Sequence, residues 1–262
     1  MLVTTDIEGG LATVTLNRPD KKNAMSLELL SALVETAAAL SQTEGLRCVI
    51  LTGAGGVFSA GIDTTLMMTM AGDVDGLKAR MAERDATGAN EFQRPMTCWA
   101  GLDVPVIAAI SGICFGAGMQ LALGADFRIA APDTRMSIME AKWGLIPDMG
   151  ITQSLPRLMG ADRAKLLMMT GQELNGEDAL NMGLVTEVAE EPMARAREIA
   201  AAIMGRSPDS VAASKKLVER AWPGPGQEGL VLEAELQTAL MGGPNQIEAV
   251  MANMQKRPPR FG

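Results

Sequence analysis

The 262-residue chain contains no histidine and no tyrosine. These absences exclude a Ser-His-Asp triad, a Cys-His pair, a histidine-held zinc or haem, and a tyrosine-lysine dehydrogenase dyad. Acid–base chemistry must therefore be carried by Glu, Asp, Lys or Cys side chains. Backbone N–H groups remain as the other means of stabilising a developing negative charge.

Cysteine is scarce, and Cys48, Cys98 and Cys114 are widely spaced with no CxxC pair. Cys48 and Cys114 stand in apolar or small-residue stretches, which predicts buried free thiols and neither a disulfide nor a metal site. The chain also lacks a run of about 18 apolar residues and a basic-then-apolar start. We expect a soluble, cytoplasmic protein with no metal and no membrane span.

Positive charge is in short supply, since 23 Lys and Arg residues face 31 Asp and Glu residues, for a formal net charge of −8. This balance argues against nucleic acid as a partner, because binding a phosphate backbone needs a basic face. Two local basic clusters remain, one made by Arg18, Lys21 and Lys22 and one at residues 256–260. Each is either solvated surface charge or a set of phosphate contacts.

Nearly half of the residues are apolar, which is enough for a sizeable core. Hydrophobic periodicity predicts strands alternating with helices over most of the chain, and hence a layered α/β fold built from repeated strand–turn–helix units. We expect a hairpin over residues 1–16, a helix capped by Ser26 and ending near residue 41, a helix over 117–123, and strands over 46–52, 104–110, 126–130 and 135–138.

Beyond about residue 190 the pattern is purely helical. Candidate helices cover residues 193–204, 208–221, 228–241 and 245–255, and they are separated by proline and glycine. We therefore divide the chain into a core at 1–190 and a helical region at 191–262, which packs on the core and on neighbouring subunits.

Two glycine-rich loops follow predicted strands, at residues 52–56 and 112–118. Neither has the lysine of a phosphate-binding P-loop, and neither fits GxGxxG with an acidic ribose ligand further on. Glycine beside a helix start can instead expose backbone N–H groups to an anion. Ala117, at a predicted helix start, and Ala60, in a turn of small residues, are the candidate donors of such an oxyanion hole.

An ordered set of short segments along nearly the whole chain resembles the crotonase (enoyl-CoA hydratase/isomerase) superfamily. Each segment is weak by itself, but the set is specific. The matching segments are residues 16–19 (LNRP), 23–25 (NAM), 58–63 (FSAGID), 110–112 (ISG), 116–122 (GAGMQLA), 125–130 (ADFRIA), 140–150, 156–158 (PRL) and 183–185 (GLV).

The resemblance implies a spiral of ββα units with a helical C-terminal region that forms trimers, often paired into hexamers. It implies acyl-CoA substrates and no cofactor beyond the coenzyme A that the substrate carries. The N–H groups of Ala60 and Ala117 would hold the thioester oxygen, although relatives more often have glycine where Ala117 stands. The coenzyme A contacts implied by the family are Arg18, Lys21, Lys22, Ala24, Ser59, Ala60, Ile62 and Asp63.

Departures from the family pattern bear on the reaction. Hydratases of this family use two glutamates, and here Glu140 keeps the second position while Gln120 stands at the first. Glutamine can hydrogen-bond water but cannot accept its proton. Asp148 stands where the dienoyl-CoA isomerase branch carries an aspartate.

We therefore predict Glu140 as the principal proton carrier and Asp148 as a second acid or as its orienting partner. Gln120 is either a contact to substrate or water or a packing residue. Double-bond isomerisation is favoured over hydration. Alternatives are another acyl-CoA reaction, such as hydrolysis, dehalogenation or decarboxylation, and a catalytically silent binding protein. Methionines within residues 64–101 either pack in the core or form an adaptable wall for an acyl chain.

Overall fold

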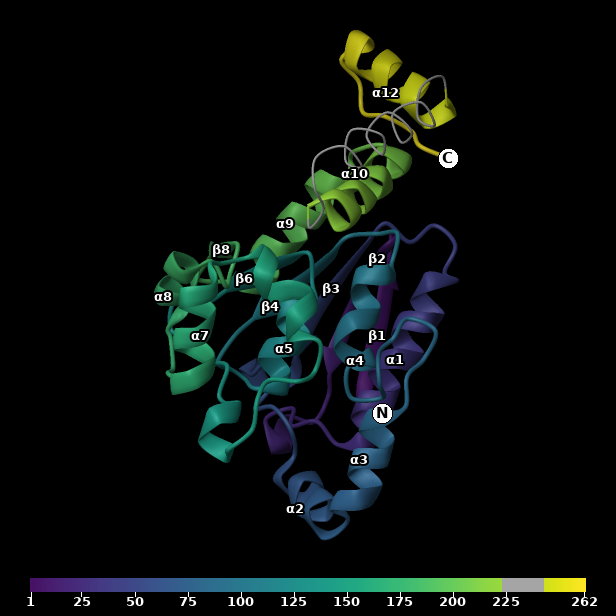
Figure 1. The fold of residues 1–262 in the computed structure, drawn as a ribbon. Coiled ribbons are helices and arrows are strands. Elements are labelled where there is room, and N and C mark those ends of the chain that lie inside the picture. Colours follow the sequence, from purple (N-terminus) through teal and green to yellow (C-terminus); the bar gives the residue numbers. More distant parts are fainter. Residues whose placement is uncertain (223–242) are drawn as a thin grey trace.

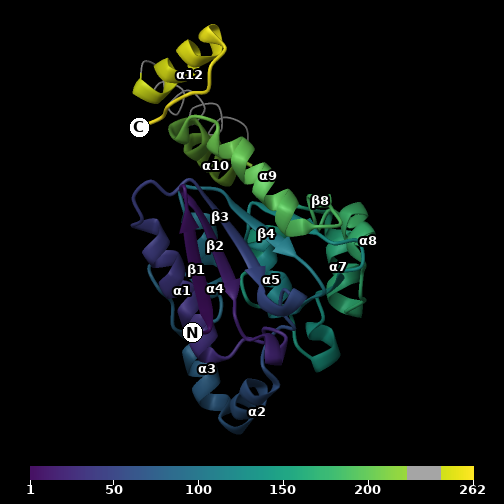
Figure 2. The same cartoon turned by 180° about the vertical axis from the view of Figure 1, so that it is seen from behind.

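The structure is a computed structural model that describes residues 1–222 and 243–262. Its centre is a six-stranded sheet in the order β1-β2-β3-β4-β6-β8 (Figures 1 and 2). β1 and β2 are antiparallel, and the later pairings are parallel, so the predicted α/β class is confirmed. The strands are β1 (Val3–Glu8), β2 (Leu11–Leu16), β3 (Cys48–Gly53), β4 (Val106–Ile110), β6 (Phe127–Ala130) and β8 (Glu187–Val188).

The N-terminal hairpin and the first helix form where the sequence predicts them. Helix α1 covers Leu27–Ser41, and the Ser26 side chain accepts the Leu29 N–H at its start. Apolar side chains such as Leu29 and Leu33 recur at helical spacing and are fully buried. Burial of this one stripe against the sheet accounts for the position of the helix.

Both faces of the sheet are covered, which explains why β3 and β4 are apolar without alternation. Val49 and Leu51 point into the larger core, which also contains buried residues of α1 and of α5 (Ala117–Leu123). Ile50 points the other way, into a smaller core formed with helix α9 (Pro192–Met204).

After three of the sheet strands the chain enters a second, shorter layer. β5 (Ile113–Phe115) follows β4, β7 (Arg135–Ser137) follows β6, and the two pair in parallel. The segment after β3 joins this layer through a parallel bridge between Ser59 and Cys114. A helical element follows each short strand, and these three ββα turns confirm the predicted spiral.

Some elements were not anticipated from the sequence. Only three residues form β5, and the glycines around it predict a turn instead. Helix α7 (Ala161–Thr170) has one buried residue, Leu167, so it lacks a strong apolar stripe. The other α-helices before residue 190 are α2 (Thr64–Gly72), α3 (Val74–Ala82), α4 (Arg94–Thr97), α6 (Ile151–Ser154) and α8 (Gly176–Met182). The 3-10 turns are η1 (Pro19–Lys21), η2 (Ala54–Gly56), η3 (Cys98–Gly101), η4 (Glu140–Trp143) and η5 (Leu155–Arg157).

Two methionines of residues 64–101 differ in burial. Met96 is buried and belongs to the larger core. Met68 is 78% exposed, so it packs in no core. A wall for an acyl chain therefore stays a prediction for the exposed part of this stretch.

The C-terminal part contains α9, α10 (Pro208–Ala221) and α12 (Pro244–Gln255), close to three of the predicted helices. The predicted helix over 228–241 lies outside the described residues. Helix α9 packs on β3, β4 and β6, so the helical region begins on the sheet, and the division at residue 190 stays a prediction. Among the helices described, none combines the length and apolarity that crossing a membrane requires.

Candidate active site

Three segments meet at one place because their short strands are in register. Ser59 is bridged to Cys114, and Cys114 pairs with Met136. Neighbouring parallel strands keep equivalent positions close together. Position 62 lies three residues after Ser59, position 117 three residues after Cys114, and position 140 four residues after Met136.

Glycines let these segments approach more closely than side chains would allow. A Cβ atom added to Gly118 would lie 2.7 Å from the Cβ of Ser59. One added to Gly61, which has a φ of 94°, would lie 2.8 Å from the Phe115 oxygen and 3.6 Å from the Ala117 nitrogen. The turn at Gly61 is therefore in backbone contact with the start of α5.

The two free amides at this contact are those of Ile62 and Ala117. Ala117 opens α5, so its N–H has no partner within the helix, and no side chain caps it. The Gly61 oxygen and the Asp63 N–H both bond Met25, so the Ile62 N–H between them points away from Met25. Neither amide has an acceptor within the described chain.

The expectation that the Ala60 N–H lines an oxyanion hole is wrong. This N–H donates to the Lys22 oxygen at 2.9 Å and is therefore already occupied. Lys22 and Asn23 both have positive φ values, 51° and 55°, and this turn brings the Lys22 carbonyl to Ala60. The free amide lies two residues further along, at Ile62.

The Glu140 carboxyl lies beside the same contact. A Cβ atom added to Gly116 would lie 3.5 Å from Glu140 Oε1, which places the carboxyl next to the start of α5. Glu140 Oε1 accepts a hydrogen bond from Gln120 Nε2 at 2.8 Å. Glu140 Oε2 is buried and has no partner. An unpartnered carboxylate oxygen in a buried site is ready to accept a proton from a ligand.

Burial raises the pKa of the Glu140 carboxyl above its usual range. The hydrogen bond from Gln120 opposes this rise in pKa, and the negative charge of Asp148 adds to it. Burial also raises the pKa of Asp148. Glu140 bonds Gln120, Gln120 bonds the residue after Asp148, and the Asp148 charge acts on Glu140. The three predicted residues therefore lie in one cluster, and their roles in proton transfer stay predictions.

The predicted coenzyme A contacts are only partly free. The Arg18 guanidinium pairs with Asp63 at 3.0 Å and donates to the Ala24 oxygen at 2.6 Å, so it is committed inside the protein. Lys21 and Lys22 are exposed. The basic cluster predicted for phosphate thus reduces to these two lysines.

Ser59 is fully buried, and its hydroxyl donates to the Asn23 oxygen at 2.9 Å. Asn23 was not among the predicted site residues, yet it organises the loop before the site. Its side chain accepts the Arg18 N–H and donates to the oxygens of Ala54 and Val57. A buried amide with three partners fixes the turn. Its signal in the sequence is its place in residues 23–25, one of the segments that resemble the family.

In the second basic cluster, Arg257 pairs with Glu248. Cys48 and Cys114 are buried free thiols, as predicted, and Cys98 is a partly buried one. Burial raises the pKa values of Cys48 and Cys98 to about 12 and raises that of Cys114 as well. A protonated thiol is a poor nucleophile, so the cysteines are unsuited to nucleophilic catalysis near neutral pH.

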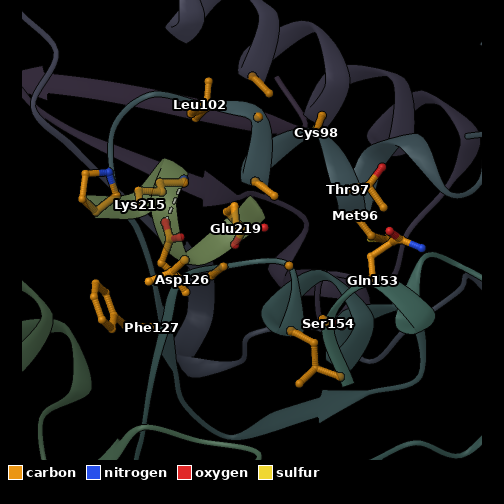
Figure 3. A pocket seen from close by; sticks show the side chains of 18 of the residues that line it. Met96, Thr97, Cys98, Leu102, Asp126, Phe127, Gln153, Ser154, Lys215 and Glu219 are labelled. Atoms are coloured by element: carbon orange, nitrogen blue, oxygen red, sulfur yellow. Dashed lines mark hydrogen bonds and ion pairs between the residues drawn. The ribbon is translucent and has the colours of Figure 1, made fainter. Parts of the chain in front are cut away.

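A cavity of about 1690 Å³ lies between the core and α10 (Figure 3). Lys215 of α10 pairs with Asp126 at 2.8 Å, and Glu219 of α10 pairs with Arg157. Both pairs tie the helix to the core. Gln120 is among the residues that line this cavity, whereas Glu140 and Asp148 are not. The cavity therefore meets the cluster at Gln120 and does not include the two carboxyls.

No group of three or more Cys, Asp or Glu side chains suited to a metal ion occurs in the described part of the chain. The chemistry available at the site is that of two amide donors and two carboxyls. Amide donors stabilise an oxyanion, and a carboxyl with a raised pKa can both accept and return a proton near neutral pH.

Comparison with known proteins agrees with this geometry. A family model described as Enoyl-CoA hydratase/isomerase matches residues 6–262. The Short-chain-enoyl-CoA hydratase of Clostridium acetobutylicum is 34% identical over 95% of this chain and 93% of its own length. The peroxisomal Delta(3,5)-Delta(2,4)-dienoyl-CoA isomerase of Arabidopsis thaliana is 29% identical over 99% of this chain and 95% of its own length.

Solved structures are similar over the same extent. A crystal structure of an enoyl-CoA hydratase from Bacillus anthracis superposes with a TM-score of 0.90 at 31% identity, covering 100% of this chain and 99% of that one. The sequence matches and this structural similarity show that the chain belongs to the enoyl-CoA hydratase/isomerase family of the crotonase superfamily.

Proposed function

We propose that this protein acts on an acyl-CoA thioester and moves the proton on the carbon next to the thioester carbonyl. Glu140 is the proton carrier, and the N–H groups of Ile62 and Ala117 hold the thioester oxygen. The observation that supports this assignment is the buried, unpartnered Oε2 of Glu140 beside the two free amides. A buried carboxylate oxygen without a partner is costly unless a ligand uses it.

The proposed reaction is a shift of a double bond. The Glu140 carboxylate takes the proton from C2 of a 3-enoyl-CoA, and the C–H electron pair moves into the conjugated system ending on the thioester oxygen. The same carboxyl then returns the proton to C4, which leaves the double bond between C2 and C3. Each amide donor on the developing oxyanion contributes about 3–4 kcal/mol to lowering the barrier.

Hydration is disfavoured because it needs a second group that removes a proton from water. Gln120 stands at that position, and an amide cannot accept a proton near neutral pH. Both ends of the amide are also engaged, with Glu140 Oε1 and with the Met149 N–H. This leaves Glu140 as the carboxyl beside the oxyanion donors.

Asp148 is proposed as a second proton site for longer conjugated substrates. Its pKa is raised by burial, and its charge acts on Glu140, so the pair can hold one proton between them. Two proton sites would let the enzyme move a pair of double bonds in a 3,5-dienoyl-CoA. The relative from Arabidopsis thaliana carries that activity in its name.

A substrate panel tests this proposal. The purified protein is incubated with 2-enoyl-, 3-enoyl- and 3,5-dienoyl-CoA, and the products are followed by absorbance and mass. We expect the 3-enoyl-CoA to change absorbance with no change in mass. A mass gain of one water would establish hydration, and loss of coenzyme A would establish hydrolysis. Unchanged substrates that nevertheless bind would favour a binding protein.

Lys21 and Lys22 are proposed to contact the phosphates of coenzyme A. Both are exposed and directly precede Asn23, whose carbonyl oxygen accepts the Ser59 hydroxyl. Replacing both by alanine should weaken binding of coenzyme A by about tenfold and leave binding of its dephospho form less affected. Equal affinities of the variant and the original protein for coenzyme A would show that the two lysines do not contact its phosphates.

We also propose that residues 191–262 carry subunit contacts in a homotrimer or a dimer of trimers. Large apolar side chains of this region are exposed in the single chain, among them Val218 at 48% and Trp222 at 70%. Such groups are commonly covered by a neighbouring subunit. Sedimentation equilibrium tests this point, and a monomer at micromolar concentration would contradict it.

A further inference from the structure

Gln120 occupies an unusual place for a polar side chain. It lies in α5, whose seven residues are all buried, and is itself 2% exposed. Both ends of its amide are used: Nε2 donates to Glu140 Oε1, and Oε1 accepts the Met149 N–H, each at 2.8 Å. A buried polar group with a partner at each end is costly to replace and specifies one arrangement.

The two hydrogen bonds fix the direction of the amide. A flipped amide would place its NH2 group against the Met149 N–H and its oxygen against Glu140 Oε1. Two donors would then face each other, and so would two acceptors. Because the Met149 N–H can only donate, it holds the Gln120 NH2 group toward Glu140.

This arrangement makes the two oxygens of Glu140 different. Oε1 is held by Gln120, while Oε2 has no partner and is buried. Rotation of the carboxyl would exchange the two oxygens, and the hydrogen bond from Gln120 resists it. Proton transfer is then confined to one oxygen in one orientation, which is the condition for short, aligned transfer.

Gln120 also joins the two segments that carry the carboxyls. Glu140 stands in η4, and Asp148 immediately precedes Met149. Between them the chain exposes Trp143 at 58% and Ile146 at 74%, so little packing holds this stretch. The bonds from one buried side chain to Glu140 and to Met149 therefore set the spacing of the carboxyls.

We infer that Gln120 is a positioning residue, which confines proton transfer to Oε2 of Glu140 and holds the Asp148 segment at a fixed spacing from it. The inference rests on the proposed function, because it assigns Gln120 a role in the same reaction. It replaces the prediction that Gln120 contacts substrate or water.

The charged groups around Glu140 give the inference a pH signature. Asp148 is the charged neighbour whose field acts on Glu140, and it raises the pKa of Glu140 while Gln120 lowers that pKa. Other charges on nearby elements are Lys142 on η4 itself, Glu173 and Arg135, which pair with each other, and Asp162, Arg163 and Lys165 at the start of α7, which packs on η4.

Two substitutions should therefore move the pKa of Glu140 in opposite directions. Gln120→Leu removes a hydrogen bond that favours the carboxylate, so the pKa of Glu140 rises. Asp148→Asn removes a negative charge, so the pKa of Glu140 falls. A base works only when it is deprotonated, so the pH at which activity appears should move up in the first variant and down in the second.

The experiment measures exchange of the α-proton of butanoyl-CoA in heavy water by NMR, between about pH 5 and 9. We expect Gln120→Leu to lower kcat by about 10- to 100-fold with KM nearly unchanged, because misplacement of a catalytic group costs on that order. Gln120→Met, an unbranched replacement of similar size, should behave alike and guards against a packing defect. Thermal melts of both variants check folding.

A second readout does not depend on turnover. Difference infrared titration of the carboxyl band, with Glu140→Gln as the reference, follows the protonation of Glu140 directly. A titration midpoint of Glu140 that is unchanged in folded Gln120→Leu would overturn the positioning role while leaving the proposed function intact. Wild-type protein that exchanges no α-proton would overturn the proposed function and the positioning role together.

Discussion

The two sides of the site are built differently. On the amide side, Ile62 and Ala117 present backbone N–H groups that are fixed by strand register and by close glycine contacts. On the carboxyl side, Glu140 and Asp148 lie on a 3-10 turn and a loop. The Gln120 side chain bonds the Glu140 carboxyl and the N–H of Met149, the residue after Asp148. Backbone groups tolerate changes of side chain, whereas a single substitution can displace a carboxyl. The two sides should therefore respond differently to mutation.

The largest effect is expected on the carboxyl side, from Glu140→Gln. Loss of the proton carrier should slow α-proton exchange by about 10²- to 10⁴-fold. Binding of acyl-CoA should persist, because the amide side is untouched. Exchange in heavy water and calorimetric binding measure the two quantities. Full exchange by the variant would remove Glu140 from the chemistry and undo the contrast between the two sides.

On the amide side, only loss of an N–H should have a comparable effect. Ala117→Pro removes this N–H at the first position of a helix, where proline is otherwise tolerated. We expect kcat to fall by about 10²- to 10³-fold, the effect of losing one oxyanion donor. Ala117→Gly keeps the N–H and is the matched control. Similar kcat values for the proline and glycine variants would show that the Ala117 amide takes no part.

A smaller effect concerns stability and pH. Burial raises the pKa of Glu140 in the folded state, so the stability linked to its protonated form is present at low pH and is lost as pH rises through the folded pKa. Above that pH, the melting temperature of Glu140→Gln should therefore exceed that of the wild type by about 2–4 °C. Below about pH 4 the two melting temperatures should be nearly equal. Melting curves across pH measure the difference, and a constant offset would indicate that burial of charge is not its cause.

The smallest effect is expected for a side-chain change on the amide side. Ile62→Val keeps the N–H and the β-branched shape and removes one methyl group. Unfolding by denaturant should show a loss of about 0.5–1.5 kcal/mol, and kcat should change by less than about threefold. A large fall in kcat with intact stability would show that the Ile62 side chain, and not its amide, serves the reaction.

The same contrast explains what the sequence predicts and what it does not. The strands, α1 and the helical C-terminal region follow from apolar periodicity and from a capping serine, which are local signals. Glu140, Gln120 and Asp148 were found through the family resemblance and through the absence of histidine. Both rest on side-chain identity, which a sequence states directly.

The amide donor at Ile62 could not be found in this way. Every residue except proline has an N–H, so composition does not distinguish Ala60 from Ile62. Which of them is free depends on the left-handed turn at Lys22 and Asn23, which brings a carbonyl to Ala60. The buried side-chain amide of Asn23 holds this left-handed turn by donating to the Ala54 and Val57 oxygens of another loop. Such contacts are tertiary and leave little trace in local pattern.

The register of Ser59, Cys114 and Met136 has a consequence for how the chain can change in length. Positions 62, 117 and 140 lie three or four residues beyond these paired positions. One inserted or deleted residue in those short spans would therefore turn an amide or a carboxyl away from the other groups of the site. Residues 64–105 form the connection between the segment that contains Ser59 and the strand that precedes Cys114. Its length and sequence can therefore vary between relatives while the amides of Ile62 and Ala117 and the carboxyl of Glu140 keep their places.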